Sequence, residues 1–134
     1  MKGKSMVSIG MAECKLGVEG AKAVAELASV TASLTKILVC WNKLGDESTA
    51  ILCDALRGSK VTKVQELDLS QNDIGPEGAK AVAAMAAVVG SLTRLDVSHN
   101  NMGDGGVKLL RDALRERQDQ ALDLKFEGNE DHDD

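Results

Sequence analysis

The chain has 134 residues and a formal net charge of −5, and 43% of its residues are hydrophobic although it has one Trp, one Phe and no Tyr. This length indicates one domain. The excess of acidic residues disfavours binding to nucleic acid, which needs a basic face. No apolar run is long enough to cross a membrane. The start lacks a secretory signal, and three cysteines without metal-like spacing favour a reducing, intracellular setting, which we assign to the cytoplasm.

A repeated pattern with one landmark position organises the chain. Successive landmarks lie 28, 30, 28 and 29 residues apart, and they are Cys14, Asn42, Asn72, Asn100 and Asn129. A fixed period of this size is typical of a stacked repeat array. The repeats run over about residues 6–33, 34–63, 64–91, 92–120 and, in part, 121–129. Residues 1–5 are expected to be a disordered leader and residues 130–134 an acidic tail.

Each repeat begins with apolar residues at alternate positions, a pattern that predicts a short strand with one buried face. In the third repeat Leu67 and Leu69 face inward, while Glu66, Asp68 and Ser70 face out. The fifth repeat is expected to contribute only a strand, around residues 121–126, and a turn. The matching inward residues of the other repeats are Ile9 and Met11, Ile37 and Val39, Leu95 and Val97, and Leu124 and Phe126.

After the landmark of each of the first four repeats comes a glycine suited to a tight turn, and then a helical pattern. In the third repeat Pro76 follows Gly75, at a position suited to the first turn of a helix. Helices are expected near residues 18–27, 47–56, 76–90 and 104–116. The second repeat has Ser48 and Thr49 where the third has Gly78 and Ala79, so its helix start departs from the pattern.

The third repeat carries a specific resemblance in Leu67, Leu69, Asn72, the Ile74-Gly75 pair and the Gly78-Ala79 pair. This pattern resembles the leucine-rich repeat of the ribonuclease-inhibitor type, which is also found in Ran GTPase-activating proteins and NOD-like receptors. The resemblance covers about residues 6–129. It implies an α/β fold, a right-handed solenoid that forms a short arc, with parallel strands on the concave face and helices on the convex face. It also implies asparagines that bond backbone groups in the turns.

The outward strand residues fall into columns across the expected concave face, where the resemblance implies binding of a protein partner. One column is Lys36, Glu66, Arg94 and Asp123, the next is Gly10, Leu38, Asp68, Asp96 and Lys125, and the third is Ala12, Cys40, Ser70, Ser98 and Glu127. Trp41 is the sharpest candidate, since an exposed Trp makes a good interface anchor; the alternative is that it folds over the rim and covers Leu38 and Cys40. The predicted binding residues are Lys36, Leu38, Trp41, Glu66, Asp68, Gln71, Arg94, Asp96 and His99.

Catalysis finds little support in these columns. The neighbouring carboxylates Asp68 and Asp96 could act as acid and base or hold a metal ion, but we favour a solvated acidic stripe balanced by Lys36 and Arg94. Asp96, Ser98 and His99 cannot converge as a triad, because neighbours on a strand alternate sides. The sequence therefore predicts a protein that is not an enzyme and has no catalytic, metal-binding or cofactor-binding residue.

Two alternatives to a binding module stay open. Solenoid ends usually need a polar cap, and the first repeat lacks one, so its strand residues Met6, Val7, Ile9 and Met11 could associate with a second copy. At the other end, only the acidic tail could cover the fifth repeat. The second alternative is a GTPase-activating protein of the Ran-related class, which would need an arginine at the nucleotide. Arg94 lies on the expected concave face, yet no catalytic motif of that family is recognisable.

Overall fold

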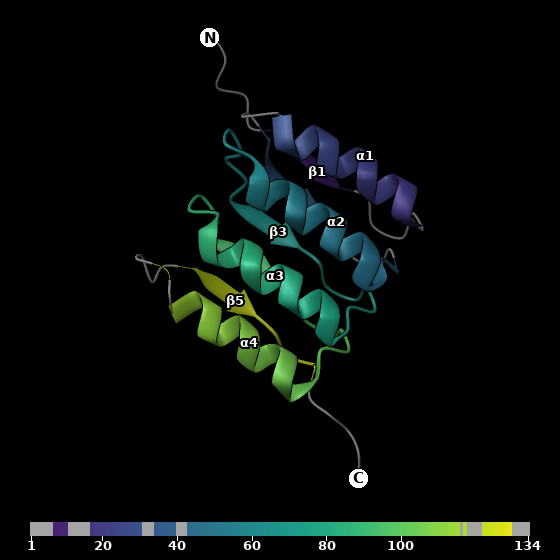
Figure 1. Cartoon of the computed structure of the whole chain (residues 1–134), viewed down its shortest axis with the longest axis vertical. Helices are drawn as coiled ribbons and strands as arrows, with labels where there is room; N and C mark the ends of the chain where they lie inside the picture. The colour runs from purple at the N-terminus through teal and green to yellow at the C-terminus, as the bar shows by residue number, and fades with distance from the viewer. Residues whose placement is uncertain are drawn as a thin grey trace.

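The structure, a computed structural model, describes residues 7–10, 17–30, 34–39, 43–115, 117 and 122–129. Strands and helices alternate along it, and the strands form one parallel five-stranded sheet in chain order. The helices lie side by side in a layer over one face of the sheet (Figure 1). The chain is thus an α/β solenoid, as expected. Its elements are β1 (Val7–Gly10), α1 (Gly17–Val30), β2 (Leu34–Leu38), α2 (Gly45–Gly58), β3 (Glu66–Asp68), α3 (Pro76–Val88), β4 (Arg94–Asp96), α4 (Gly103–Arg115) and β5 (Asp123–Lys125).

The strand register confirms two of the predicted columns. Lys36 pairs with Glu66, Glu66 with Arg94, and Arg94 with Asp123. The second column follows in the same way through Gly10, Leu38, Asp68, Asp96 and Lys125. Because pairing in a parallel sheet keeps equivalent residues level, each repeat places the same outward positions side by side.

The core between sheet and helices is aliphatic. Leu67 on β3, Leu95 on β4 and Leu69 just after β3 are fully buried, so burial of apolar surface stabilises each repeat against its neighbours. Glycine permits close packing of the helices. A Cβ atom at Gly78 would lie 2.7 Å from Oδ1 of Asp46, and one at Gly106 would lie 3.2 Å from the Cβ of Ala79. These two glycines therefore let α3 approach α2 and let α4 approach α3.

The second helix extends further than the sequence pattern indicated. It begins at Gly45 instead of near residue 47, and it ends at Gly58, the glycine expected to terminate it. Ser48 and Thr49, which replace the Gly-Ala pair of the third repeat, are buried with relative exposures of 1% and 0%. Their hydroxyl oxygens have no hydrogen-bond partner within the described chain. Packing of Leu52 and Leu56 into the core outweighs this mismatch.

The landmark asparagines form a ladder of buried amides, as predicted. The Oδ1 atom of Asn100 accepts hydrogen bonds from the backbone N–H groups of Asn72 at 2.8 Å and of Ile74 at 3.0 Å. Its Nδ2 atom donates to the carbonyls of Leu69 at 3.0 Å and Val97 at 2.9 Å. Each amide thus joins its own repeat to the preceding one. Asn129 repeats the arrangement with Met102, Val97 and Phe126, whereas Cys14 and Asn42 lie outside the described residues.

Arg117 caps the end of α3, which the sequence did not reveal. Its side chain is buried, with 7% of the residue exposed. Its guanidinium donates to the carbonyls of Ala86, Val89 and Leu92 at 2.7, 2.9 and 2.9 Å, and more weakly to that of Gly90 at 3.4 Å. Carbonyls at a helix C-terminus lack partners within the helix, and the helix dipole favours a cation there.

Candidate functional site

The outward face of the strands is the candidate binding surface. Its first column carries alternating charges, and the Nζ atom of Lys36 lies 3.8 Å from Oε1 of Glu66. Arg94 is exposed beside Glu66. Within the described residues no ion pair involves Arg94. Of the two cations in this column, Lys36 is therefore paired with Glu66, and Arg94 is available to bind a partner.

The second column contains carboxylates whose role is local. Oδ1 of Asp68 accepts hydrogen bonds from the backbone N–H of Ser70 at 3.0 Å and from its hydroxyl at 2.7 Å. Asp96 and Ser98 repeat this geometry at 3.0 and 2.6 Å. These bonds hold the chain as it leaves each strand.

Two expectations are corrected by this geometry. Ser70 and Ser98 were expected to face outward, but they are buried, with 8% and 5% exposed, because their hydroxyls turn toward the preceding aspartates. The second correction concerns the acidic stripe of Asp68 and Asp96, which Lys36 and Arg94 were expected to balance. Lys36 pairs with Glu66, and no ion pair joins Asp68 or Asp96 to a cation within the described part of the chain.

A groove of about 490 Å³ lies at the rim, where the strands run into the turns, and it is lined by Lys43, Gln71, Asp73 and His99. These four residues flank the landmark asparagines, and all have positive φ, between 51° and 59°. Gln71 and His99 were predicted binding residues, whereas Lys43 and Asp73 were missed. Their signal in the sequence is their position immediately after Asn42 and Asn72.

His99 is held in place by the next repeat. A Cβ atom at Gly128 would clash with Nδ1 of His99, and Gly128 also has a φ of +80°. The backbone N–H of His99 donates to the carbonyl of Glu127 at 2.8 Å. The imidazole therefore lies against the fifth repeat, and only glycine leaves it room there.

Several predicted site residues cannot be placed. Trp41, Met6 and Met11 lie outside the described residues, while Val7 and Ile9 belong to the edge strand β1.

Among the described residues there is no group of three or more His, Cys, Asp or Glu residues that could hold a metal ion. Burial raises the pKa of the Cys53 thiol in the core, which makes it a poor nucleophile.

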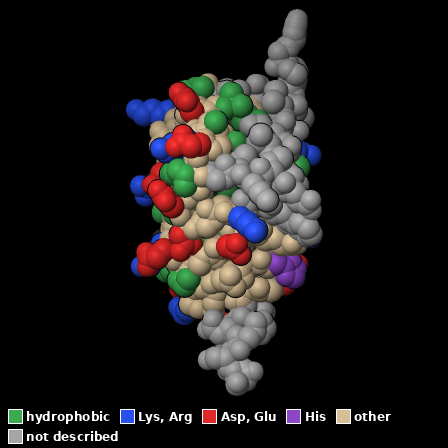
Figure 2. Space-filling view, turned by 90° about the vertical axis from the view of Figure 1, so that its right-hand side faces the viewer, with side chains coloured by type: hydrophobic (Ala, Val, Ile, Leu, Met, Phe, Trp, Pro, Cys, Tyr) green, Lys and Arg blue, Asp and Glu red, His purple; other side chains and the backbone are tan. Residues whose placement is uncertain are grey.

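Figure 2 shows the side of the molecule on which the strands end and the helices begin, with acidic side chains gathered mostly over the helix layer. This distribution agrees with the acidic residues in the first turns of the helices, namely Glu19, Asp46, Glu47, Glu77 and Asp104. Carboxylates there are favourable because the N-terminus of a helix carries partial positive charge. The strand face beside them offers exposed side chains of both signs, which suits recognition of a protein surface. None of the described helices has the length and apolar character needed to cross a bilayer.

Comparison with known proteins agrees with the resemblance to leucine-rich repeats. A family model described as leucine rich repeat matches residues 62–83 and 91–110. The chain is 30% identical over 102 residues to human "NACHT, LRR and PYD domains-containing protein 12", covering 76% of this chain and 10% of that protein. It is 30% identical over 115 residues to mouse "Ribonuclease inhibitor", covering 86% of this chain and 25% of that protein. The chain therefore spans between a tenth and a quarter of the length of these relatives.

Proposed function

We propose that this chain, which belongs to the leucine-rich repeat family in its ribonuclease-inhibitor-like form, is a non-catalytic module that binds another protein. The observation that carries the proposal is the register of the sheet, which places exposed side chains of both signs in columns beside an open groove. Such a surface can match a partner's charges one by one. The domain would comprise residues 6–129, and a buried free thiol at Cys53 supports an intracellular setting.

Arg94 is the residue that we expect to contribute most within the described surface. It is exposed and central in its column, and arginine is enriched among residues that dominate binding energy. Glu66 and Lys36 already neutralise each other, so they would contribute mainly to orientation. Gln71 and His99 would contact the partner at the rim.

A crosslinking experiment tests the proposal and identifies the partner at the same time. A photo-crosslinking amino acid would replace Gln71 at the rim of the strand face, so that Arg94 stays in place, or, as the matched control, Lys80, which is exposed on helix α3. Crosslinked proteins from the source cells would be identified by mass spectrometry, and binding of the purified partner would then be measured. We expect Arg94→Glu to weaken binding by about tenfold or more and Lys80→Glu by less than about twofold. Equal crosslinking from both positions, or equal losses, would contradict binding through the strand face.

A purified ribonuclease is a suitable first probe, because two of the relatives, from mouse and pig, are named ribonuclease inhibitor. The same variants apply, so binding that Arg94→Glu leaves unchanged would not support the proposed surface. The sequence alternatives of self-association through the ends and of GTPase activation stay predictions. No described feature favours either of them over binding by the strand face.

A further inference from the structure

The loop between α2 and β3 carries an insertion that the equivalent loops lack. The distance from the helix end to the next buried strand position is six residues in the second repeat and four in the first and third, counted from Gly58 to Val64, from Val30 to Leu34 and from Val88 to Leu92. These two extra residues account for the 30-residue spacing of the second repeat. In repeat arrays, insertions of this kind fall in loops on one face, which is often the binding face.

Hydrogen bonds hold the inserted loop beside the end of the first helix. The hydroxyl of Ser59 donates to the carbonyl of Ser29 at 2.7 Å and accepts from the backbone N–H of Val61 at 3.2 Å. On the other side, the hydroxyl of Ser91 donates to the carbonyl of Val64 at 2.8 Å. The loops that follow α2 and α3 thus lie on the same edge of the molecule, at the left in Figure 1.

Exposed apolar side chains gather on this edge. Val61 lies in the inserted loop and is 45% exposed. Val30 and Val88, the last residues of α1 and α3, are 69% and 60% exposed. The repeat containing Val88 has a neighbour on each side, so this exposure belongs to the position within the repeat. Large apolar side chains that gather at a surface often mark an interaction site.

The same loop is basic, although the chain as a whole has a net charge of −5. Arg57, Lys60 and Lys63 are exposed. None of them takes part in an ion pair with another described residue. Acidic side chains, in contrast, occupy the first turns of the helices, at the opposite edge.

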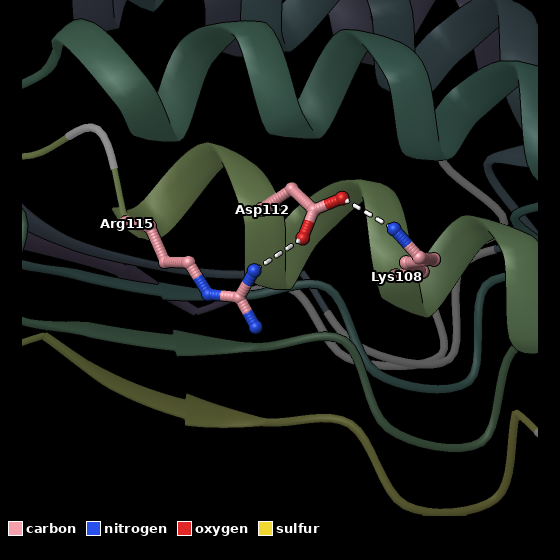
Figure 3. A network of polar contacts seen from close by, with 3 residues as sticks. All are labelled: Lys108, Asp112 and Arg115. Atoms are coloured by element: carbon pink, nitrogen blue, oxygen red, sulfur yellow. Dashed lines mark hydrogen bonds and ion pairs between the residues drawn. The ribbon is translucent and has the colours of Figure 1, made fainter.

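The fourth helix shows how such a cation is neutralised elsewhere in the array. Asp112 accepts hydrogen bonds from Lys108 at 2.9 Å and from Arg115 at 3.0 Å (Figure 3). The hydrogen bond from Lys108, together with nearby positive charge, lowers the pKa of Asp112. Asp54 and Arg57 occupy the equivalent positions on α2, yet no ion pair joins these two described residues. The charge of Arg57 therefore remains available at the inserted loop.

This combination of charge and apolar surface indicates the chemistry of an occupant. Unpaired cations attract carboxylates, and the valines between and beside them would be covered by aliphatic side chains. An anionic membrane fits less well. Surfaces that bind at the lipid interface usually present Trp, Phe or Leu, whereas the exposed apolar residues of this edge are valines.

We propose that this edge is a second docking surface, formed by Arg57, Lys60, Val61 and Lys63 with Val30 and Val88 on either side, and that it binds an acidic segment of a partner protein. Carboxylates of the segment contact Lys60 and Lys63, and aliphatic residues between them cover Val61. The surface is separate from the strand face and does not depend on the function proposed for it.

The test begins with random peptides displayed on phage and selected on the whole chain. We expect the selected peptides to carry Asp or Glu on both sides of Val, Leu or Ile. A selection that yields no such peptides would overturn the proposal. One selected peptide is then synthesised with a fluorescent label, and its binding is measured by anisotropy.

Charge reversal tests where the peptide binds. Lys60→Glu together with Lys63→Glu should weaken binding by about tenfold or more, because two surface ion pairs are replaced by repulsion. The matched control, Lys80→Glu with Lys108→Glu, changes the net charge equally on exposed lysines of α3 and α4. It should weaken binding by less than about threefold, since salt screens charges more than about 8 Å apart. Equal losses in the two variants would overturn the proposal, and circular dichroism checks that both fold.

Removal of apolar groups tests whether charge alone holds the peptide. Val61→Ser should weaken binding by about fivefold, and so should replacement of the aliphatic residues of the peptide by Ser. Unchanged binding in either case would mean general attraction between opposite charges and would overturn the proposal.

Two further measurements separate this surface from other sites. Arg94→Glu should leave binding of the peptide unchanged, and a loss would instead place the peptide on the strand face. Co-sedimentation with phosphatidylserine vesicles should be absent. Co-sedimentation that Lys60→Glu abolishes would assign the edge to a membrane and overturn the proposal.

Discussion

Arg117 allows a quantitative test of how the third helix is held. Replacing it by Ala removes the guanidinium donors that serve the buried carbonyls of Ala86 and Leu92. The carbonyl of Val89 also loses a donor but keeps the backbone N–H of Leu92 at 3.2 Å. A buried carbonyl left without a partner costs about 1–3 kcal/mol. The space vacated by the side chain admits water, so we take the lower end for each carbonyl. With two carbonyls left without a partner, the expected loss is about 2 kcal/mol of unfolding free energy, which is a large part of the stability of a domain of this size.

The assay is urea denaturation followed by circular dichroism, with the slope of the transition checked for two-state behaviour. Arg115→Ala is the matched control, because that side chain is 73% exposed and its hydrogen bond among the described residues is to Asp112. It should cost less than about 1 kcal/mol. Arg117→Lys should recover only part of the loss, because one ammonium group cannot reach the same set of carbonyls. A loss below about 1 kcal/mol for Arg117→Ala, or full recovery by Lys, would refute the role of the guanidinium fork.

Three further predictions concern the ladder, the second helix and acid stability. Asn100→Ala should lower the unfolding free energy measured by urea denaturation by about 2–4 kcal/mol, because it leaves buried backbone groups of two repeats unpaired. The control, Asn101→Ala, changes an exposed neighbour and should lower it by less than about 0.5 kcal/mol. Thr49→Ala removes a buried hydroxyl that has no hydrogen-bond partner among the described residues. This gain and the higher helix propensity of alanine should outweigh the loss of one methyl group, so we expect the unfolding free energy to rise by about 0.5–1.5 kcal/mol. A decrease would show that the hydroxyl is satisfied. The pKa of Asp112 is lowered from 3.8, so its contribution to stability is present above pH 3.8 and is lost as the pH falls through the pKa of the folded state. The melting temperatures of the parent protein and of Asp112→Asn should therefore differ at pH 6 and converge in acid. A difference that stays constant with pH would contradict the ion pairs of Asp112.

The sequence predicted the parts of the fold that repeat. Alternating residues such as Leu67 and Leu69 defined the strands, and the spacing of the asparagines fixed the register of the columns. These predictions succeeded because each repeat is stabilised mainly by its neighbours, so one pattern recurs in each copy. The buried role of Asn72 and Asn100 was anticipated from the resemblance to the ribonuclease-inhibitor type of repeat.

Features that do not follow from the alternation of the strands were not predictable in this way. Arg117 has no equivalent pattern in the other copies, and arginine is seldom buried in proteins. Ser70 and Ser98 were assigned outward by strand alternation, but the alternation ends with the strands at Asp68 and Asp96. At the rim, the groove depends on the positive φ angles of residues that flank the asparagines, and side-chain periodicity does not report such angles.

The asparagine ladder also constrains how such a chain can change its length during evolution. Each amide takes its partners from two consecutive repeats, as Asn100 does with Leu69 and Val97. Duplication or loss of one whole unit joins equivalent ends and leaves every amide with a full set of partners. A partial insertion would separate an amide from its neighbours and leave polar groups unpaired in the core. Proteins built on this ladder are therefore expected to grow and shrink in complete repeats.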